Sequence, residues 1–386
     1  MNTKELKNFF NYLNLTWDIF GPKEVSLSKK DQHQVLIERL ENFDDLVLDS
    51  RLPYFSFKRF FVPESEILFD YKNGELKESP QKGSRSMKGF HSASSLLKEQ
   101  EEKFLLPFSK KGGRAVLLGL NLLDLKSILL YDQVFEKDPY YQARRQNILV
   151  IGHNLVPDLP QNIFEQTFEE DVLEHLSFDI FLAEIPASRS AAGSENRGKK
   201  LLPKLFVKSQ DKQQPKNYAV FTGSLRGQQI LKDFGYEDFI HIQFSGPVKE
   251  GKLDERMIKL RDKLKNKHNQ KIWDELGKRC IECGKCTVAC PTCFCFRIDD
   301  AAGLANSEGQ RQRCWDSCYY QEFSEVAGGH KFLNSTAARI HFWYYHKFAR
   351  IPDEFDFMGC IGCRRCAAVC PVGIDIGEVL KKIEES

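Results

Sequence analysis

The middle of the chain alternates short apolar runs with stretches of helical spacing. Arg114–Leu120, "RAVLLGL", is a nearly continuous apolar run that predicts a buried strand, and Leu123–Phe135 has the apolar spacing of a helix. Further strands are predicted at 146–154, 178–185 and 217–224, and further helices at 168–176 and 226–236. Strands and helices that alternate in this way are typical of an α/β layer domain.

Residues 1–110 mix both kinds of pattern. Thr3–Leu15 and Lys29–Phe43 have helical spacing, whereas Tyr54–Tyr71 alternates aromatic and polar residues as edge strands do. We predict that this mixed region forms one unit with residues 111–250, which serve as an α/β scaffold domain.

Composition and charge limit the partners and the location that the sequence predicts. A formal net charge of +2 over 386 residues gives no reason to expect a nucleic-acid partner. The most apolar stretch, Ala115–Tyr131, is interrupted by polar and charged residues and is too short for a bilayer span. The first residues show no secretory signal, so the expected location is cytoplasmic, where thiols stay reduced.

Sulfur is confined to the C-terminal part. All 12 cysteines lie between Cys280 and Cys370. Two motifs share the spacing C-x2-C-x2-C-x3-C-P, and their cysteines are Cys280, Cys283, Cys286 and Cys290, then Cys360, Cys363, Cys366 and Cys370. This spacing is the bacterial-type [4Fe–4S] signature, whose fourth cysteine binds the other cluster.

The signature therefore predicts two [4Fe–4S] clusters with exchanged ligands. The first would be held by Cys280, Cys283, Cys286 and Cys370, and the second by Cys360, Cys363, Cys366 and Cys290. Paired zinc knuckles are the alternative, since C-x2-C also occurs in zinc sites. Zinc has no use for a third spaced cysteine or for the closing prolines, so we favour iron and sulfide.

Four cysteines remain outside the two motifs, namely Cys293, Cys295, Cys314 and Cys318. Their C-x-C and C-x3-C spacings could supply a third metal site. Alternatively they line the cluster pocket, as buried free cysteine often does.

The cysteine motifs are separated by a long insert with helical spacing, for example at Asn334–Ile351, and Asp254–Arg279 predicts a helix or helix pair before the first motif. We therefore predict an α/β (α+β) N-terminal domain followed by an all-α helical ferredoxin-type domain with two [4Fe–4S] clusters. The predicted ranges are 1–110, 111–250 and 251–386.

Three stretches of the sulfur region, "CPTCFCFRIDD", "RCWDSCYYQEFSEVAGGH" and "GCIGCRRCAAVCPVGIDI", resemble the iron–sulfur β subunits of cytosolic sulfhydrogenases, the NAD(P)-linked [NiFe] hydrogenases. The A subunit of anaerobic sulfite reductase belongs to the same family. The resemblance implies a subunit that relays electrons between a flavin- and NAD(P)-binding subunit and a catalytic partner. That partner would be the small and large [NiFe] hydrogenase subunits, or a sulfite reductase catalytic subunit.

This chain has no convincing nucleotide site of its own, since no G-x-G-x-x-G follows a strand. We therefore expect an electron-relay subunit of an oxidoreductase with no catalytic residues, and FAD and NAD(P) on a partner. The alternative of another class is a sulfur or disulfide reductase that uses the four extra cysteines. A non-redox zinc module is a third reading.

Overall fold

The computed structural model describes residues 1–27, 32–73, 75–77, 113–155, 157, 172–185, 216–246, 255–266, 271–303 and 307–385. These residues fall into two compact units, each assembled from separate segments. Unit 1 takes its described residues from Met1–Phe57, Leu106–Gln133 and Ala143–Val248. Unit 2 takes them from Lys58–Leu105, Val134–Gln142 and Lys249–Ser386. The domain boundaries predicted at 110/111 and 250/251 lie outside the described residues, so those ranges stay a prediction.

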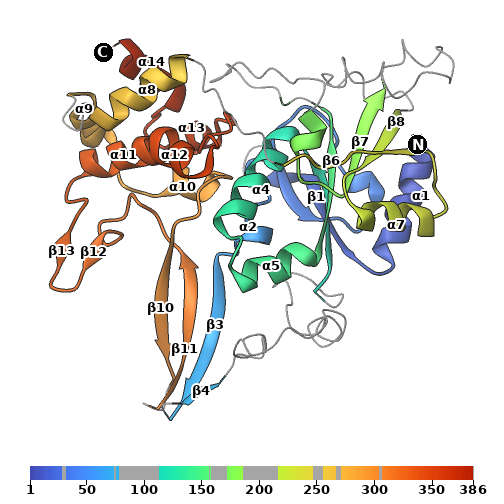
Figure 1. The fold of residues 1–386 in the computed structure, drawn as a ribbon, viewed down its shortest axis with the longest axis horizontal. Helices are drawn as coiled ribbons and strands as arrows, with labels where there is room; N and C mark the ends of the chain where they lie inside the picture. The colour runs from blue at the N-terminus through green and yellow to red at the C-terminus, as the bar shows by residue number, and fades with distance from the viewer. Residues whose placement is uncertain are drawn as a thin grey trace. The chain divides into compact units, whose positions relative to one another are not determined.

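Unit 1 is built round a seven-stranded sheet with the order β2-β1-β5-β6-β7-β8-β9 (Figure 1). The strands are β1 Asp18–Leu27, β2 Gln32–Arg39, β5 Ala115–Leu120, β6 Ile148–His153, β7 Ile180–Ile185, β8 Asn217–Thr222 and β9 Phe239–His241. Strands β1, β5, β6 and β7 run parallel, and β8 is antiparallel to β7. Every residue of β5 and β6 is buried, as expected for parallel strands covered on both faces. The α/β class predicted for this region is confirmed.

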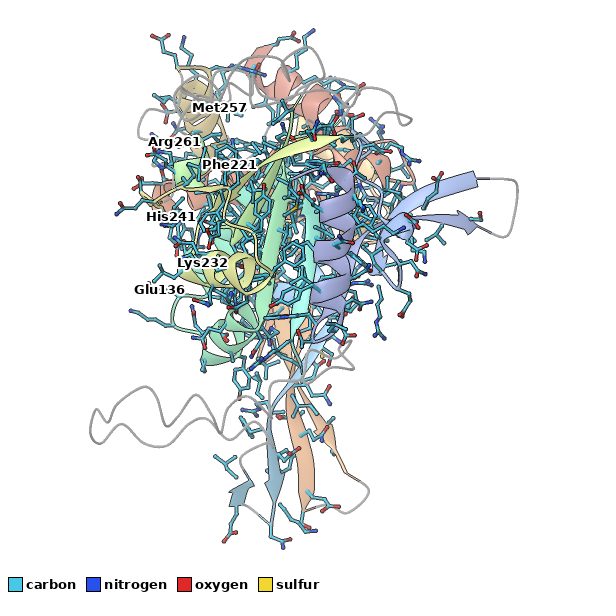
Figure 2. All side chains as sticks on the ribbon, turned by 90° about the vertical axis from the view of Figure 1, so that its right-hand side faces the viewer. Glu136, Phe221, Lys232, His241, Met257 and Arg261 are labelled. Atoms are coloured by element: carbon cyan, nitrogen blue, oxygen red, sulfur yellow. The ribbon has the colours of Figure 1, made fainter. Side chains whose placement is uncertain are left out.

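Helices of this unit contribute buried apolar side chains. They are α1 Thr3–Asn14, α4 Leu122–Val134 and α7 Leu225–Asp233, with 3-10 turns at Phe43–Asp45 and Val172–His175. Helix α5 Pro139–Gln146 begins in the segment assigned to unit 2 and ends in that assigned to unit 1. Helix α1 starts at a capping box formed by Asn2 and Glu5, and buries its apolar side chains in the same core as β5, β6 and β7. In Figure 2, Phe221 of β8 lies among the side chains of this sheet, and only 1% of it is exposed. The apolar positions along the sequence thus explain how helices α1 and α7 share one core with the strands.

One predicted helix of unit 1 is wrong. Lys29–Phe43 has helical spacing, yet its described part forms strand β2, which pairs antiparallel with β1. Val35 and Ile37 are buried and alternate along the strand. A short apolar run fits both periods, and here the hydrogen bonds offered by β1 select the strand.

A buried histidine makes the stability of unit 1 depend on pH. His153 ends β6, is 6% exposed, and accepts a hydrogen bond at Nδ1 from Leu155 N at 3.0 Å. Burial lowers the pKa of His153 to about 4. An unfolded chain takes up this proton below about pH 6.5, whereas the folded chain takes it up only near pH 4. Folding therefore loses stability as the pH falls through this window.

We expect acidification from pH 7 to pH 5 to cost about 2 kcal/mol through this residue alone. Calorimetry of the wild type and of His153→Gln at both pH values would measure it. The variant should lose less stability than the wild type over that interval. Equal losses in wild type and His153→Gln would contradict the assignment.

Unit 2 contains the helices predicted for the C-terminal region. Its helices are α2 Lys58–Phe61, α8 Glu255–Asn266, α9 Lys271–Arg279, α10 Lys285–Ala289, α11 Thr336–Tyr345, a π-helical turn His346–Arg350, α12 Ile351–Phe355, α13 Arg365–Ala368 and α14 Ile376–Glu385. The helix pair expected before Cys280 is present as α8 and α9. Trp273 of α9 contacts His341 and Tyr344 of α11, which packs α11 on α9.

The C-terminal region is nevertheless not all-α, and that part of the predicted fold class is wrong. β10 Phe296–Ala302 and β11 Glu308–Trp315 form a hairpin, which β3 Ser65–Lys72 and β4 Glu75–Lys77 extend into the sheet β10-β11-β3-β4 (Figure 1). A small pair of strands, Glu325–Val326 and His330–Lys331, follows. Strand β10 is mostly exposed, and its large apolar side chains, Phe296 and Ile298, are exposed as well, so it has no buried apolar face.

Side-chain contacts explain why residues 58–77 and 134–142 belong to this unit. The Arg313 guanidinium on β11 is buried, donates from Nε to Glu66 Oε1 on β3 at 2.6 Å, and also pairs with Asp138. Trp315 Nε1 donates to Val62 O at 2.9 Å.

None of the helices in the described part of the chain is both long enough and apolar enough to cross a membrane.

Candidate metal centre

Both cysteine motifs fold into the same local structure. In the first, Cys280 directly follows α9, Cys286 lies in the short helix α10, and Cys290 follows that helix. In the second, Cys366 lies in the short helix α13, and Cys370 comes after it. The repeated spacing thus corresponds to a repeated loop–helix turn.

Each motif carries two residues with positive φ, one before and one after its second cysteine. They are Glu282 (57°) and Gly284 (68°) in the first motif, and Gly362 (73°) and Arg364 (56°) in the second. Each loop therefore has glycine at one left-handed position and a larger residue at the other, in opposite order. Left-handed residues in tight loops turn backbone N–H groups toward one side, which makes a concavity that suits anions and iron–sulfur sites.

The two larger residues are held in this conformation by charged partners. Glu282 pairs with the buried Arg339 and accepts from Gln321 Nε2 at 3.0 Å. Arg364 pairs with Asp375. A left-handed non-glycine residue costs about 1–2 kcal/mol, and these contacts offset that cost. Both loops are thus held by contacts with other side chains of this chain.

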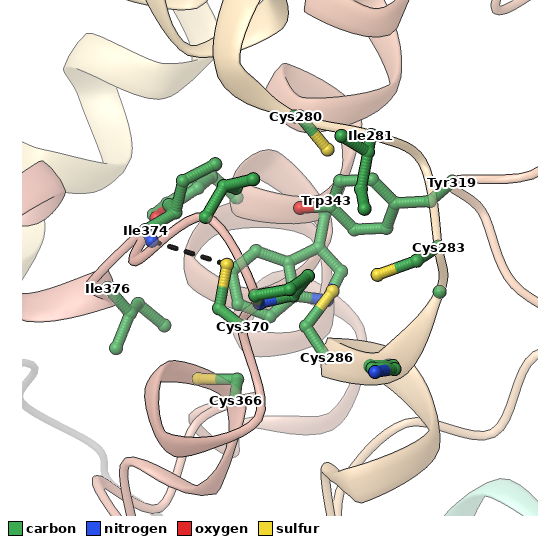
Figure 3. Close-up of a pocket in the computed structure, with 15 residues that line it drawn as sticks. Cys280, Ile281, Cys283, Cys286, Tyr319, Trp343, Cys366, Cys370, Ile374 and Ile376 are labelled. Carbon is green, nitrogen blue, oxygen red and sulfur yellow. Dashed lines mark hydrogen bonds between the residues drawn. The ribbon is translucent and has the colours of Figure 1, made fainter.

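One pocket gathers cysteines from both motifs. Figure 3 shows the sulfurs of Cys280, Cys283, Cys286 and Cys370 facing a common space, with Cys366 lower in the view. The remaining wall is largely apolar and aromatic, and includes Ile281, Tyr319, Trp343, Tyr344, Pro371, Val372, Ile374 and Ile376. The structure therefore places the fourth cysteine of the second motif with the first three of the first motif.

The fourth cysteine of the first motif, Cys290, lies beside the second motif. Helices α10 and α13 pack against each other, which carries Cys290 toward the second motif. Burial raises the pKa of Cys360 to about 12, and charge on Cys290 and Cys363 acts in the same direction. Burial likewise raises the pKa of Cys366, again with Cys290, Cys360 and Cys363 as neighbours. These four thiols lie close enough to repel one another when ionised.

Such crowded, buried thiols need a cation to become thiolates together. Burial raises the pKa of Cys286 to about 12, and its neighbours Cys280 and Cys283 add to the effect. A metal core supplies the compensating charge and removes the protons from its ligands. Both sets therefore have the donor chemistry that an iron–sulfur cluster requires.

Backbone N–H groups also point at the candidate ligands. Ile374 N donates to Cys370 Sγ at 3.2 Å, the dashed line in Figure 3, and Glu282 N donates to Cys280 Sγ at 3.4 Å. Hydrogen bonds to sulfur are among the factors that set the potential of iron–sulfur clusters. The left-handed turn at Glu282 places the second of these donors.

Within the described residues, no group of three or more His, Cys, Asp or Glu side chains converges closely enough for a single metal ion. A zinc site draws its ligands to about 2–2.3 Å from one point. A [4Fe–4S] cubane has four irons, each bound by a different cysteine, so its thiolates stand apart at the corners. The assignment of individual ligands stays a prediction.

Of the four remaining cysteines, three lie beside another cysteine and one lies apart. Cys293 hydrogen-bonds to Cys290, and Cys295 hydrogen-bonds to Cys318, which is 1% exposed. Cys314 instead lies on β11, where its Sγ approaches Ser65 Oγ at 3.5 Å. The third metal site predicted from all four stays a prediction.

Two buried lysines lie beside the cysteine sulfurs, and the sequence patterns did not predict them. Lys347 is 2% exposed, and its Nζ donates to Cys290 Sγ at 3.2 Å. Lys58 is 6% exposed and donates to Thr287 O at 3.2 Å, close to Cys290 and Cys293. Burial opposes the charge on Lys347, but the sulfurs of Cys290 and Cys293 outweigh burial and raise the pKa of that lysine above its ordinary value. A lysine within an aromatic helix, "FWYYHKFAR", was the available signal.

Comparisons with known proteins support the metal chemistry. Residues 279–374 match the family described as a 4Fe-4S dicluster domain. Over its whole length the chain is similar to "Sulfhydrogenase 2 subunit beta" of Pyrococcus furiosus, with 25% identity over 397 aligned positions that cover 100% of this chain and 98% of the relative. No solved structure matches the chain. The resemblance to the sulfhydrogenase β subunits is confirmed, and a 4Fe-4S dicluster domain lies in the C-terminal part.

Proposed function

We propose that this chain, a homologue of the sulfhydrogenase β subunits, is the iron–sulfur electron-transfer subunit of a multi-subunit cytoplasmic oxidoreductase. It would relay electrons between a flavin- and NAD(P)-binding subunit and a [NiFe] hydrogenase. The observation that carries the proposal is that Cys370 of the second motif lines one pocket with Cys280, Cys283 and Cys286 of the first, while both motifs fold as a loop followed by a short helix. In this proposal the two motifs exchange their fourth cysteines, Cys290 and Cys370, and hold two clusters within one unit.

In this proposal each ligand set has three cysteines from its own loop and one from the other. Cys280, Cys283 and Cys286 act with Cys370, and the second set joins Cys360, Cys363, Cys366 and Cys290. The clusters supply reversible one-electron transfer. The residues around them fix the loops, donate hydrogen bonds to sulfur and, through the apolar wall in Figure 3, keep water away.

The α/β unit fits a scaffold role. The stretch "FTGSLRG" runs from the end of β8 into α7, and Ser224 caps that helix. Ser224 Oγ accepts a hydrogen bond from Gly227 N at 3.0 Å and donates one to Asp179 Oδ1 at 2.6 Å. A Cβ at Gly227 would lie 2.1 Å from Asp179 O. The glycine is thus used for close packing, which is consistent with FAD and NAD(P) sites on partner subunits.

Metal content tests the proposal. Anaerobically purified protein should contain about eight irons and about eight acid-labile sulfides, as two [4Fe–4S] clusters require. About twelve irons would indicate that Cys293, Cys295 and Cys318 help to hold a third cluster, and polysulfide reduction by the chain alone would favour the sulfur reductase alternative. Zinc without labile sulfide would overturn the proposal.

A further inference from the structure

Lys347 joins three segments around one cysteine sulfur. Its Nζ donates to Cys290 Sγ at 3.2 Å, Thr292 Oγ1 at 3.1 Å and Gly359 O at 2.9 Å. Thr292 Oγ1 also donates to Gly359 O at 2.8 Å and lies 3.1 Å from Cys290 Sγ. The ammonium therefore connects the end of the first motif, the start of the second and the helix between them.

The backbone is shaped to bring this side chain in. Lys347 belongs to the π-helical turn His346–Arg350 between α11 and α12, and π turns occur often at functional sites. Gly359, directly before Cys360, donates from N to Lys347 O at 3.0 Å. A Cβ on Gly359 would lie 2.7 Å from Lys347 O and 2.8 Å from Lys347 Cα, so a larger residue would force the second motif away.

Charge balance points to the sulfur. A buried ammonium is costly unless a negative group compensates it. The three acceptors of Lys347 are a hydroxyl, a carbonyl and the Cys290 sulfur, and of these only the cysteine ionises. The positive charge is thus set directly against a thiolate that, in the proposed function, is a cluster ligand.

We propose that Lys347 sets the reduction potential of the cluster held by Cys290, Cys360, Cys363 and Cys366, by holding a positive charge and an N–H donor against the Cys290 sulfur. The inference rests on the proposed function. Addition of one electron makes a cluster more negative, and a fixed buried cation stabilises that form, so Lys347 raises the potential.

The test is a redox titration of the full-length, anaerobically purified protein, followed by EPR, with a chemical reductant that supplies one electron to each cluster. Lys347→Met should lower one of the two midpoint potentials by a tenfold or larger change in the reduction equilibrium, ~59 mV for one electron. The other potential should change by less than about threefold. Lys259→Met removes the same charge from an exposed side chain of α8 and should move neither potential.

Lys347→Arg, which keeps the charge, should keep the wild-type potential within about threefold. Unchanged potentials in Lys347→Met would overturn the inference, as would an arginine variant that shifts as far as the methionine variant. If Lys347→Met loses the cluster, a loaded Lys347→Arg with wild-type potential supports the inference. Loss of the cluster in both the methionine and the arginine variants overturns it. A wild type without clusters would instead refute the proposed function.

Discussion

Replacing Cys370 with alanine should remove the cluster bound by the first motif and spare the cluster of the motif in which Cys370 itself lies. Cys370 shares a pocket with Cys280, Cys283 and Cys286, and Ile374 N donates to its sulfur there. An alanine leaves that set with three thiolates and no fourth donor at the corner. Iron content should fall from about eight to about four per chain.

Double variants decide which cluster is lost. Cys370→Ala combined with Cys283→Ala should remove no more iron than Cys370→Ala alone, because both residues serve one cluster. Cys370→Ala with Cys363→Ala should remove nearly all of it. The reverse result would show that each motif binds its own cluster without exchange. Cys314→Ala, a change on β11 beside Ser65, should leave the iron content unchanged.

The sequence predicted the scaffold where burial is two-sided. Residues 115–120 and 148–153 are buried throughout, so their continuous apolar runs can be read without knowledge of neighbours. Strand β2 was missed because Leu36, Leu40 and Phe43 recur at helical spacing, whereas Val35 and Ile37 recur at strand spacing. Only its pairing with β1 distinguishes the two, and pairing is not visible in a local pattern.

The sheet of unit 2 was missed for a related reason. Strand β11 takes β3 as its neighbour, a segment more than two hundred residues earlier in the chain, and Arg313 reaches Glu66 across that pairing. The sequence "EGQRQRCW" does not indicate such a partner, because its side chains are mostly polar and only partly buried. Long-range pairing is therefore the information that local periodicity lacks.

At the candidate site the C-x2-C-x2-C-x3-C-P spacing predicts which cysteines bind each cluster, and that assignment stays a prediction. The structure adds that Cys370 lines the same pocket as Cys280, Cys283 and Cys286. The cysteine spacing could not predict the two buried lysines, Lys58 and Lys347. Lys347 is a surface-type residue that becomes buried only because a π turn and Gly359 close round it. Its role depends on tertiary contacts alone.

Replacing Cys363 with alanine should abolish NAD(P)H-linked turnover in the complex that copurifies with a tagged form of this chain. Cys363 is buried in the second motif, and its loss leaves that ligand set with three thiolates. Because Cys290 and Cys370 tie the two sites together, the proposed relay uses both in series, and removal of one interrupts it. The partner subunits do not depend on this cysteine for their own chemistry, so dye reduction by NAD(P)H and dye-linked hydrogen oxidation should persist.

Two measurements make this result decisive. Iron analysis and EPR must show that the second cluster is absent, and subunit ratios must show that the complex is still assembled. Cys314→Ala again serves as the matched control and should retain full turnover, since its sulfur approaches Ser65 on β3. Survival of NAD(P)H-linked turnover in the Cys363→Ala complex would mean that electrons bypass the second site. The exchanged cysteines would then serve to hold the two loops together, and a structural role for the clusters would be the better account.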